Sequence, residues 1–114
     1  LANEEVLRKA TKLKLLIRWG AGLDNVDLDA ADKLGIVVRN TPGLFGEDVA
    51  DIALSLAMNC VRQVSLFDRR IRSGDWPKET SFSFRSLTSA ILGLGAVGKE
   101  LARVLQIFGH SVRG

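Results

Sequence analysis

The chain has 114 residues, of which 46% are hydrophobic and 25% are charged, as is usual for a soluble globular domain. This composition argues against intrinsic disorder and leaves room for one ordinary domain or for parts of two. The net charge is +3, but the basic residues are mostly scattered, which disfavours a nucleic-acid-binding protein. A single cysteine, Cys60, rules out an intramolecular disulfide and a multi-cysteine metal site, so we expect a reducing, cytoplasmic compartment.

The first part of the chain predicts two strands joined by a helix. A short helix capped by Asn3 precedes a buried strand over residues 13–17. A glycine-bearing loop then leads to a helix that begins after the N-cap candidate Asp27 and ends before Gly35, and a β-branched strand follows over residues 36–39. Because a helix connects the two strands, we expect them to be parallel, with a right-handed crossover.

The longest predicted helix covers residues 47–73. Its first turn is acidic, its last turn is rich in arginine, and Gly74 follows, so its charges suit the helix dipole at both ends. Its middle is apolar over more than one face, which indicates burial by several neighbours or by a partner chain. Met58 and Cys60 lie within this apolar region, and we expect both to be core residues.

A glycine motif follows a polar stretch over residues 78–86, which predicts a linker between two structural units. Gly93, Gly95 and Gly98 form a G-x-G-x-x-G motif between an apolar strand and an amphipathic helix. Backbone N–H groups at the start of such a helix, with the positive end of the dipole behind them, favour binding of a pyrophosphate. A tight strand-to-helix turn without a ligand is the alternative that the spacing leaves open.

Seven segments carry a further signal when they are taken together in chain order: residues 13–27, 30–31, 35–43, 48–51, 74–76, 93–98 and 108–109. Their sequences and order resemble the D-isomer-specific 2-hydroxyacid dehydrogenases, which include the phosphoglycerate dehydrogenases. The resemblance covers nearly the whole chain. It implies an enzyme of two α/β domains in which a hydride passes between NAD and a 2-hydroxy or 2-keto acid.

The resemblance also implies a domain organisation. Residues 1–46 would be the end of the first segment of a flavodoxin-like substrate domain, and residues 47–77 the long inter-domain helix and its end. Residues 78–86 would be the linker, and residues 87–114 the first strand, loop and helix of a Rossmann NAD-binding domain. The catalytic arginine, glutamate and histidine of the family would lie downstream of these residues.

Two loops are implied to bind the small molecules. The backbone amides of Gly20, Ala21 and Gly22 would hold the substrate carboxylate, with a loop that merely turns into a helix as the alternative. NAD, or NADP, would lie on the second loop, which comprises Gly93, Leu94, Gly95, Ala96, Val97 and Gly98. We expect no catalytic residue and no metal ligand in the chain, and we expect the only histidine, His110, to be a structural residue at or near the surface.

The partners and two other functions follow from the same residues. A small 2-hydroxy or 2-keto acid is expected as the substrate, without nucleic acid or membrane. A homodimer is expected through the helix over residues 47–73, with Leu54, Met58 and Val61 against a second copy.

One alternative function is that of a binding module similar to the dehydrogenase-like corepressors, in which NAD controls self-association without turnover. The other is a nucleic-acid binder, which rests on the net charge and four arginines of one helix.

Overall fold

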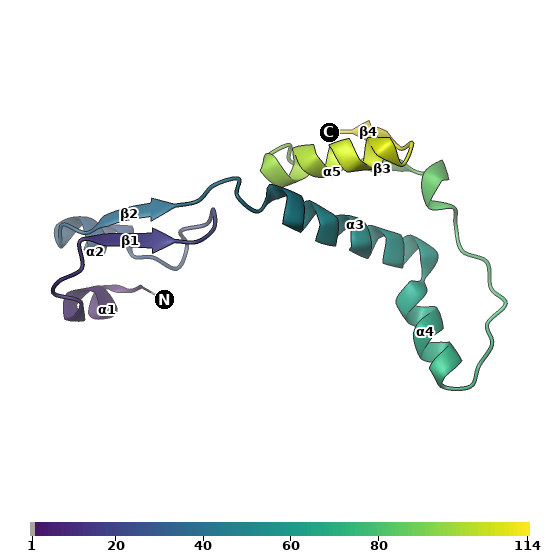
Figure 1. Cartoon of the computed structure of the whole chain (residues 1–114), viewed down its shortest axis with the longest axis horizontal. Coiled ribbons are helices and arrows are strands. Elements are labelled where there is room, and N and C mark those ends of the chain that lie inside the picture. Colours follow the sequence, from purple (N-terminus) through teal and green to yellow (C-terminus); the bar gives the residue numbers. More distant parts are fainter. Residues whose placement is uncertain (1) are drawn as a thin grey trace. The chain divides into compact units, whose positions relative to one another are not determined.

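The computed structural model of the protein describes residues 2–114. The chain divides into two compact units, Leu1–Phe45 and Gly46–Gly114. Each unit contains one pair of parallel strands together with helices (Figure 1). The α/β class predicted from the sequence is therefore confirmed.

The first unit is a short helix followed by two strands that a second helix connects. Its elements are α1 (Glu4–Lys9), β1 (Leu15–Arg18), α2 (Leu28–Lys33) and β2 (Val37–Asn40). The strands are parallel neighbours, as predicted, and their register places Arg18 opposite Asn40. The loops that follow β1 and β2 therefore begin at the same edge of the sheet.

Side-chain caps explain where the helices of the first unit begin. Oδ1 of Asn3 accepts a hydrogen bond from the N–H of Val6 at 3.1 Å, and Oδ1 of Asp27 accepts one from the N–H of Ala30 at 2.9 Å. These bonds satisfy N–H groups that have no partner within the helix. Gly35 follows the end of α2 with a φ of 66°, the left-handed conformation that lets the chain turn into β2.

The core of the first unit lies between its helices and one face of its strands. Its buried residues are Leu7, Ala30, Ala31 and Ile36. Half-buried apolar side chains pack against them: Ala2, Leu13, Leu16 and Val38. The alternate strand residues Leu15, Ile17 and Val37 are exposed, so within this unit only one face of the sheet is covered.

The second unit is built from three α-helices, a short 3₁₀ helix and two strands. They are α3 (Gly46–Arg62), α4 (Val64–Arg72), η1 (Phe84–Ser86), β3 (Thr88–Ala90), α5 (Ala96–Ile107) and β4 (Ser111–Arg113). The strands are parallel and α5 connects them. The helices α3 and α5 lie side by side (Figure 1), and the buried apolar side chains of the unit are Ala50, Phe84 and Leu105.

The prediction of one helix over residues 47–73 is wrong. The helix α3 ends at Arg62, Gln63 adopts the left-handed conformation with φ 55° and ψ 30°, and α4 continues at an angle of 60°. The N–H of Ser65 in the first turn of α4 donates to Oδ1 of Asn59 at 2.8 Å. Neither glycine nor proline marks this break, and apolar residues continue across it, so the sequence pattern predicted a single helix.

One side of α3 stays open within the second unit. Met58 is half-buried, whereas Cys60 is exposed, so the prediction of Cys60 as a core residue is wrong. The reason is that α5 and η1 cover only one side of α3 in the part of the chain that the structure describes. Three apolar side chains on this helix are exposed: Val49, Ile52 and Leu56.

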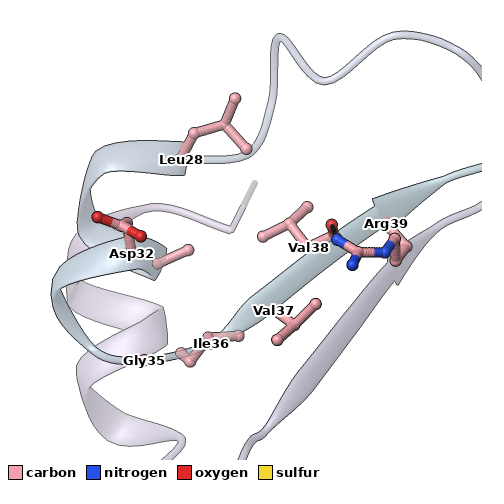
Figure 2. A pocket seen from close by; sticks show the side chains of 8 residues that line it. Leu28, Asp32, Gly35, Ile36, Val37, Val38 and Arg39 are labelled. Carbon is pink, nitrogen blue, oxygen red and sulfur yellow. Dashed lines mark hydrogen bonds between the residues drawn. The ribbon is translucent and has the colours of Figure 1, made fainter.

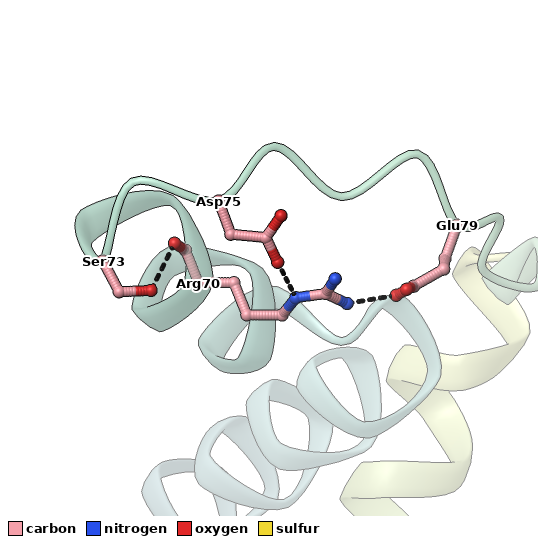
Figure 3. Close-up of polar contacts among 4 residues, drawn as sticks. All are labelled: Arg70, Ser73, Asp75 and Glu79. Atoms are coloured by element: carbon pink, nitrogen blue, oxygen red, sulfur yellow. Dashed lines mark hydrogen bonds and ion pairs between the residues drawn. The ribbon is translucent and has the colours of Figure 1, made fainter.

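An arginine ties the segment after α4 back to that helix (Figure 3). Nε of Arg70 donates to Oδ2 of Asp75 at 2.6 Å, and its Nη1 donates to Oε2 of Glu79. The hydrogen bond to Glu79, and to a smaller extent the one to Asp75, raises the pKa of the Arg70 guanidinium.

Residues 78–86, the predicted linker, lie inside the second unit. The division of the chain into a substrate domain and a cofactor domain stays a prediction.

No single helix within residues 2–114 is long and apolar enough to cross a membrane. The bent pair of α3 and α4 meets that requirement only when both helices are taken together, by length and composition alone.

Candidate functional site

The loop after β1 is held in shape by the residues that follow β2. The N–H of Gly20 donates to Oγ1 of Thr41 at 2.8 Å, and the N–H of Thr41 donates to the carbonyl oxygen of Gly20 at 3.0 Å. Nδ2 of Asn40 donates to the carbonyl oxygen of Ala21 at 2.7 Å. The segments that follow the two parallel strands are thus hydrogen-bonded to each other. They lie at the carboxyl ends of the strands, where ligands of open α/β sheets usually bind.

Only part of this loop is free to hold a ligand. The N–H of Gly20 is used by Thr41, and the backbone of Gly20 has a φ of 133°, which favours glycine. The N–H groups of Ala21 and Gly22 have no hydrogen-bond acceptor among residues 2–114. Of the three predicted residues, Gly20 therefore fixes the loop, and Ala21 and Gly22 present the available donors.

A cationic side chain that was not among the predicted site residues lies beside this loop. Arg18 is the last residue of β1, and its guanidinium donates to the carbonyl oxygen of Trp19. A Cβ atom on Gly20 would meet the same guanidinium, which shows how closely it approaches the loop. An arginine at the carboxyl end of a strand, directly before a glycine loop, is a signal that could have identified it as an anion contact.

The three glycines of the second loop have three different surroundings. Gly93 follows β3 with a φ of 95°, which only glycine adopts readily, and so makes the tight turn. Gly95 is the N-cap of α5, and a Cβ atom there would meet nothing within 4 Å. Gly98 is buried, and a Cβ atom there would lie 2.0 Å from the carbonyl oxygen of Gly93. Turn, open approach and close helix packing are the three uses of glycine in a dinucleotide-binding loop.

The amino end of α5 carries N–H groups without acceptors. No side chain caps Gly95, and the N–H of Lys99 is the first that bonds back to the loop, at 3.0 Å from the carbonyl oxygen of Gly95. Within the described chain the N–H groups of Ala96, Val97 and Gly98 have no acceptor. Such groups, together with the helix dipole, attract an anion.

The single acidic side chain in the early part of α5 is neutralised. Oε1 of Glu100 accepts a hydrogen bond from Nη2 of Arg103 at 2.5 Å. This hydrogen bond lowers the pKa of the Glu100 carboxyl. The pairing limits the repulsion that a carboxylate on this helix would exert on an anion at its amino end.

His110 is a structural residue that is more buried than the sequence predicted. It is 6% exposed, its Nδ1 lies at hydrogen-bond distance (2.8 Å) from Oγ of Ser89, and its ring is 4.4 Å from that of Phe84. It precedes β4, whereas the glycine loop follows β3, so the two lie at opposite ends of this parallel pair. The contact with Phe84 comes from η1, more than twenty residues away in the sequence, and the periodicity of the chain gave no sign of it.

A pocket of about 430 Å³ lies between α2 and β2 (Figure 2). Leu28 and Asp32 line it from the helix, and Val37, Val38 and Arg39 line it from the strand. It involves neither Gly20 nor Ala21 nor Gly22. No motif in the sequence pointed to this pocket.

Comparisons with known proteins identify the family. The model of the D-isomer specific 2-hydroxyacid dehydrogenase catalytic domain matches residues 2–109 of this chain. The chain belongs to this family. The resemblance seen in the sequence is therefore confirmed.

Individual relatives agree with this assignment. The chain is 33% identical to a glyoxylate reductase of Thermococcus litoralis in an alignment of 119 positions, gaps included, which covers 96% of this chain and 36% of that protein. It is 40% identical to a D-3-phosphoglycerate dehydrogenase of Mycobacterium tuberculosis in an alignment of 113 positions, gaps included, which covers 96% of this chain and 21% of that protein. The chain thus spans about a third or less of the length of the curated relatives it matches.

A solved structure shows the same fold with a cofactor in place. D-lactate dehydrogenase from Aquifex aeolicus, complexed with NAD and lactic acid, has a TM-score of 0.81 and 27% sequence identity to this chain. The comparison covers 96% of this chain and 34% of that enzyme. NAD use is therefore established for a relative. The two loops of this chain stay proposals as binding sites.

Proposed function

We propose that this chain supplies the cofactor loop and the substrate-carboxylate loop of an NAD-dependent dehydrogenase that acts on a D-2-hydroxy acid or the matching 2-keto acid. The observation that carries the proposal is the division of roles among the glycines after β3. Gly93 makes the turn, Gly95 leaves open space, and Gly98 lets α5 approach the carbonyl oxygen of Gly93. A plain strand-to-helix turn needs no open glycine at the N-cap of the helix.

The residues of this loop fit a dinucleotide. The unused N–H groups of Ala96, Val97 and Gly98 would donate to the pyrophosphate, and Gly95 would let the phosphates lie against the backbone. When bound there, NAD or NADP supplies the site that gives or accepts the hydride. The residues of this chain hold the cofactor by its phosphates and fix its position over the carboxyl end of β3.

The loop after β1 would orient the substrate. Ala21 and Gly22 present free N–H groups to a carboxylate, and the guanidinium of Arg18 adds a positive charge at the neighbouring Gly20. The carboxylate of Asp24, which a Cβ atom on Gly22 would meet at 2.9 Å, opposes part of this charge. The hydrogen bonds between Gly20 and Thr41 hold these donors in place before substrate arrives. The groups proposed to contact the carboxylate are therefore the N–H groups of Ala21 and Gly22 and the guanidinium of Arg18. Gly20 is no longer among them.

The domain assignment follows from the same proposal. Residues 1–46 belong to a flavodoxin-like substrate domain, and residues 87–114 open a Rossmann domain, with residues 47–77 and the linker 78–86 between them. The catalytic arginine, glutamate and histidine belong to other parts of the whole enzyme. His110 is not the catalytic histidine, because it is buried against Phe84 and hydrogen-bonded to Ser89.

The single cysteine of the chain, which is exposed in α3, supports a cytoplasmic location.

The proposed enzyme is a homodimer through α3. The exposed residues Val49, Ile52 and Leu56 recur at helical spacing and form one apolar stripe. Of the three residues expected against a second copy, Leu54 is half-buried, and Met58 and Val61 line pockets beside η1. The stripe that would meet the partner is therefore the one centred on Ile52 and Leu56.

A titration of the ¹⁵N-labelled chain with NAD tests the proposed function. The amide signals of residues 93–98 are expected to shift, because the pyrophosphate would bond to these N–H groups. Affinity is expected to be weak, since the chain spans about a third of its relatives. Shifts that spare residues 93–98 would contradict the proposal.

A further inference from the structure

A second kind of pocket lies in the second unit, and no residue of either loop lines it. It has a volume of about 330 Å³ and lies where α3 ends, α4 begins, and η1 and the end of α5 come together. Its apolar lining comes from Met58, Val64, Phe84 and Phe108, and its charged lining from Arg62 and Arg85. Volumes of about 300 to 1,000 Å³ are typical of small-molecule sites, so this pocket suits a small ligand.

Aromatic contacts shape this pocket. The rings of Phe84 and Phe108 meet edge to face, with centroids 6.0 Å apart and planes at 85°. The guanidinium of Arg85 lies 5.7 Å from the centroid of the Phe108 ring. Phe84 is buried, so η1 anchors this end of the pocket and holds Arg85 at its side. A flat apolar group would find ring faces and edges to pack against.

Both arginines of the pocket lack a carboxylate partner within residues 2–114. The acidic residues that follow α4, Asp75 and Glu79, are bound by Arg70 (Figure 3). Two other arginines of the second unit have partners, since Arg72 pairs with Asp68 and Arg103 with Glu100. Arg69 and Arg113 have no carboxylate partner among residues 2–114, but neither lines this pocket. The pocket therefore combines an apolar lining with two guanidinium groups that no carboxylate neutralises.

We propose that this pocket binds a small organic carboxylate with a flat apolar body, of the arylacetate kind. The carboxylate would meet the guanidinium groups of Arg62 and Arg85, because guanidinium and carboxylate match in charge and geometry. The apolar body would lie against Phe84, Phe108 and Met58. This site is separate from the two loops of the proposed dehydrogenase and does not depend on that function.

Phenylacetate is the probe for this site, titrated into the ¹⁵N-labelled 114-residue chain. We expect amide shifts gathered at residues 83–85 and 108. Phenylacetamide has nearly the same shape without the charge, and acetate has the charge without the ring. Each is expected to bind at least about tenfold more weakly than phenylacetate, since a charge-assisted contact or a packed ring is worth about that factor.

Arginine variants make the test specific. Arg62→Gln and Arg85→Gln are each expected to weaken phenylacetate binding about tenfold. Arg69→Gln is the matched control, because Arg69 is an exposed arginine of α4 that does not line the pocket. The affinity of this variant for phenylacetate should stay within twofold of that of the natural chain. Circular dichroism checks that each variant is folded. The NAD titration should be the same for all of them, which separates this proposal from the dehydrogenase function.

Four results would overturn the proposal. They are the absence of phenylacetate binding, equal binding of phenylacetamide, equal weakening by Arg69→Gln, and shifts gathered at residues 20–22 in place of residues 83–85 and 108. The last result would move carboxylate binding to the loop after β1. Loss of phenylacetate binding in folded Arg62→Gln and Arg85→Gln, together with unchanged binding in Arg69→Gln, would support the proposed site.

Discussion

A Cβ atom on Gly98 would lie 2.0 Å from the carbonyl oxygen of Gly93. That oxygen belongs to the backbone of a tight turn and cannot move aside like the end of a flexible side chain. Gly98→Ala is therefore expected to destabilise the chain by about 2 kcal/mol or more, within the range known for overpacked sites. Urea unfolding followed by circular dichroism measures this change.

Gly95→Ala is the control for that substitution. A Cβ atom on Gly95 would meet nothing within 4 Å, and its φ of −74° is one that alanine adopts readily. Alanine is a poorer N-cap residue than glycine, so the unfolding midpoint of this variant should fall somewhat, but by much less than that of Gly98→Ala. Equal midpoints for Gly98→Ala and the natural chain would show that α5 does not pack as closely on the glycine turn as described.

The hydrogen bond between Ser89 and His110 is expected to matter for stability. Ser89→Ala would leave the buried imidazole without a partner, since Nε2 has none among the described residues. A buried polar group left unsatisfied costs about 1 to 3 kcal/mol. Ser111→Ala, on an exposed strand position nearby, should change the free energy of unfolding by less than about 0.5 kcal/mol. Equal effects of the two substitutions would argue against the bond.

The ion pair of Glu100 and Arg103 predicts a dependence of stability on pH. Arg103 lowers the pKa of Glu100 in the folded chain, so its stabilisation is present above the unfolded pKa and is lost as pH falls through the folded pKa. Glu100→Gln should therefore lower stability at pH 7 and have little effect in acid. Glu5→Gln, at an exposed pair, is the control. A Glu100→Gln effect that stays constant from neutral to acid pH would contradict this account.

The apolar stripe of α3 predicts self-association. Light scattering at tens of micromolar should report a dimer, and Ile52→Asp or Leu56→Asp should convert it to a monomer, because each would place a charge in the apolar contact. Val64→Asp is the control, since Val64 is equally exposed but belongs to α4. A natural chain that is already monomeric would refute the proposed interface.

Local signals in the sequence were sufficient for the first unit. Asn3 and Asp27 cap helices as predicted, and Gly35 turns the chain into the second strand, because capping and left-handed turns depend on residues close in sequence. The family could be identified because seven short motifs agreed in order. The break at Gln63 could not be predicted, since glutamine has no special preference for the left-handed conformation.

The candidate sites were predicted less completely, because hydrogen bonds between distant residues decide which groups are free. The N–H of Gly20 is used by Thr41, 21 residues later, and only the folded chain shows this. The approach of Arg18 to the same loop is also a three-dimensional fact. The pairing of Asp75 and Glu79 with Arg70, which leaves Arg62 and Arg85 unpaired in the described part of the chain, needed the structure as well.

The dissociation constant of NAD for Gly95→Ala, compared with those for the natural chain and Gly22→Ala, tests the central claim most directly. Gly95→Ala should fold normally and bind NAD at least about tenfold more weakly, because a methyl group would occupy the space that the pyrophosphate needs. Gly22→Ala alters the other loop and should leave NAD binding unchanged. Equal NAD affinity for all three chains would contradict the assignment of the Gly93, Gly95 and Gly98 loop as the cofactor site.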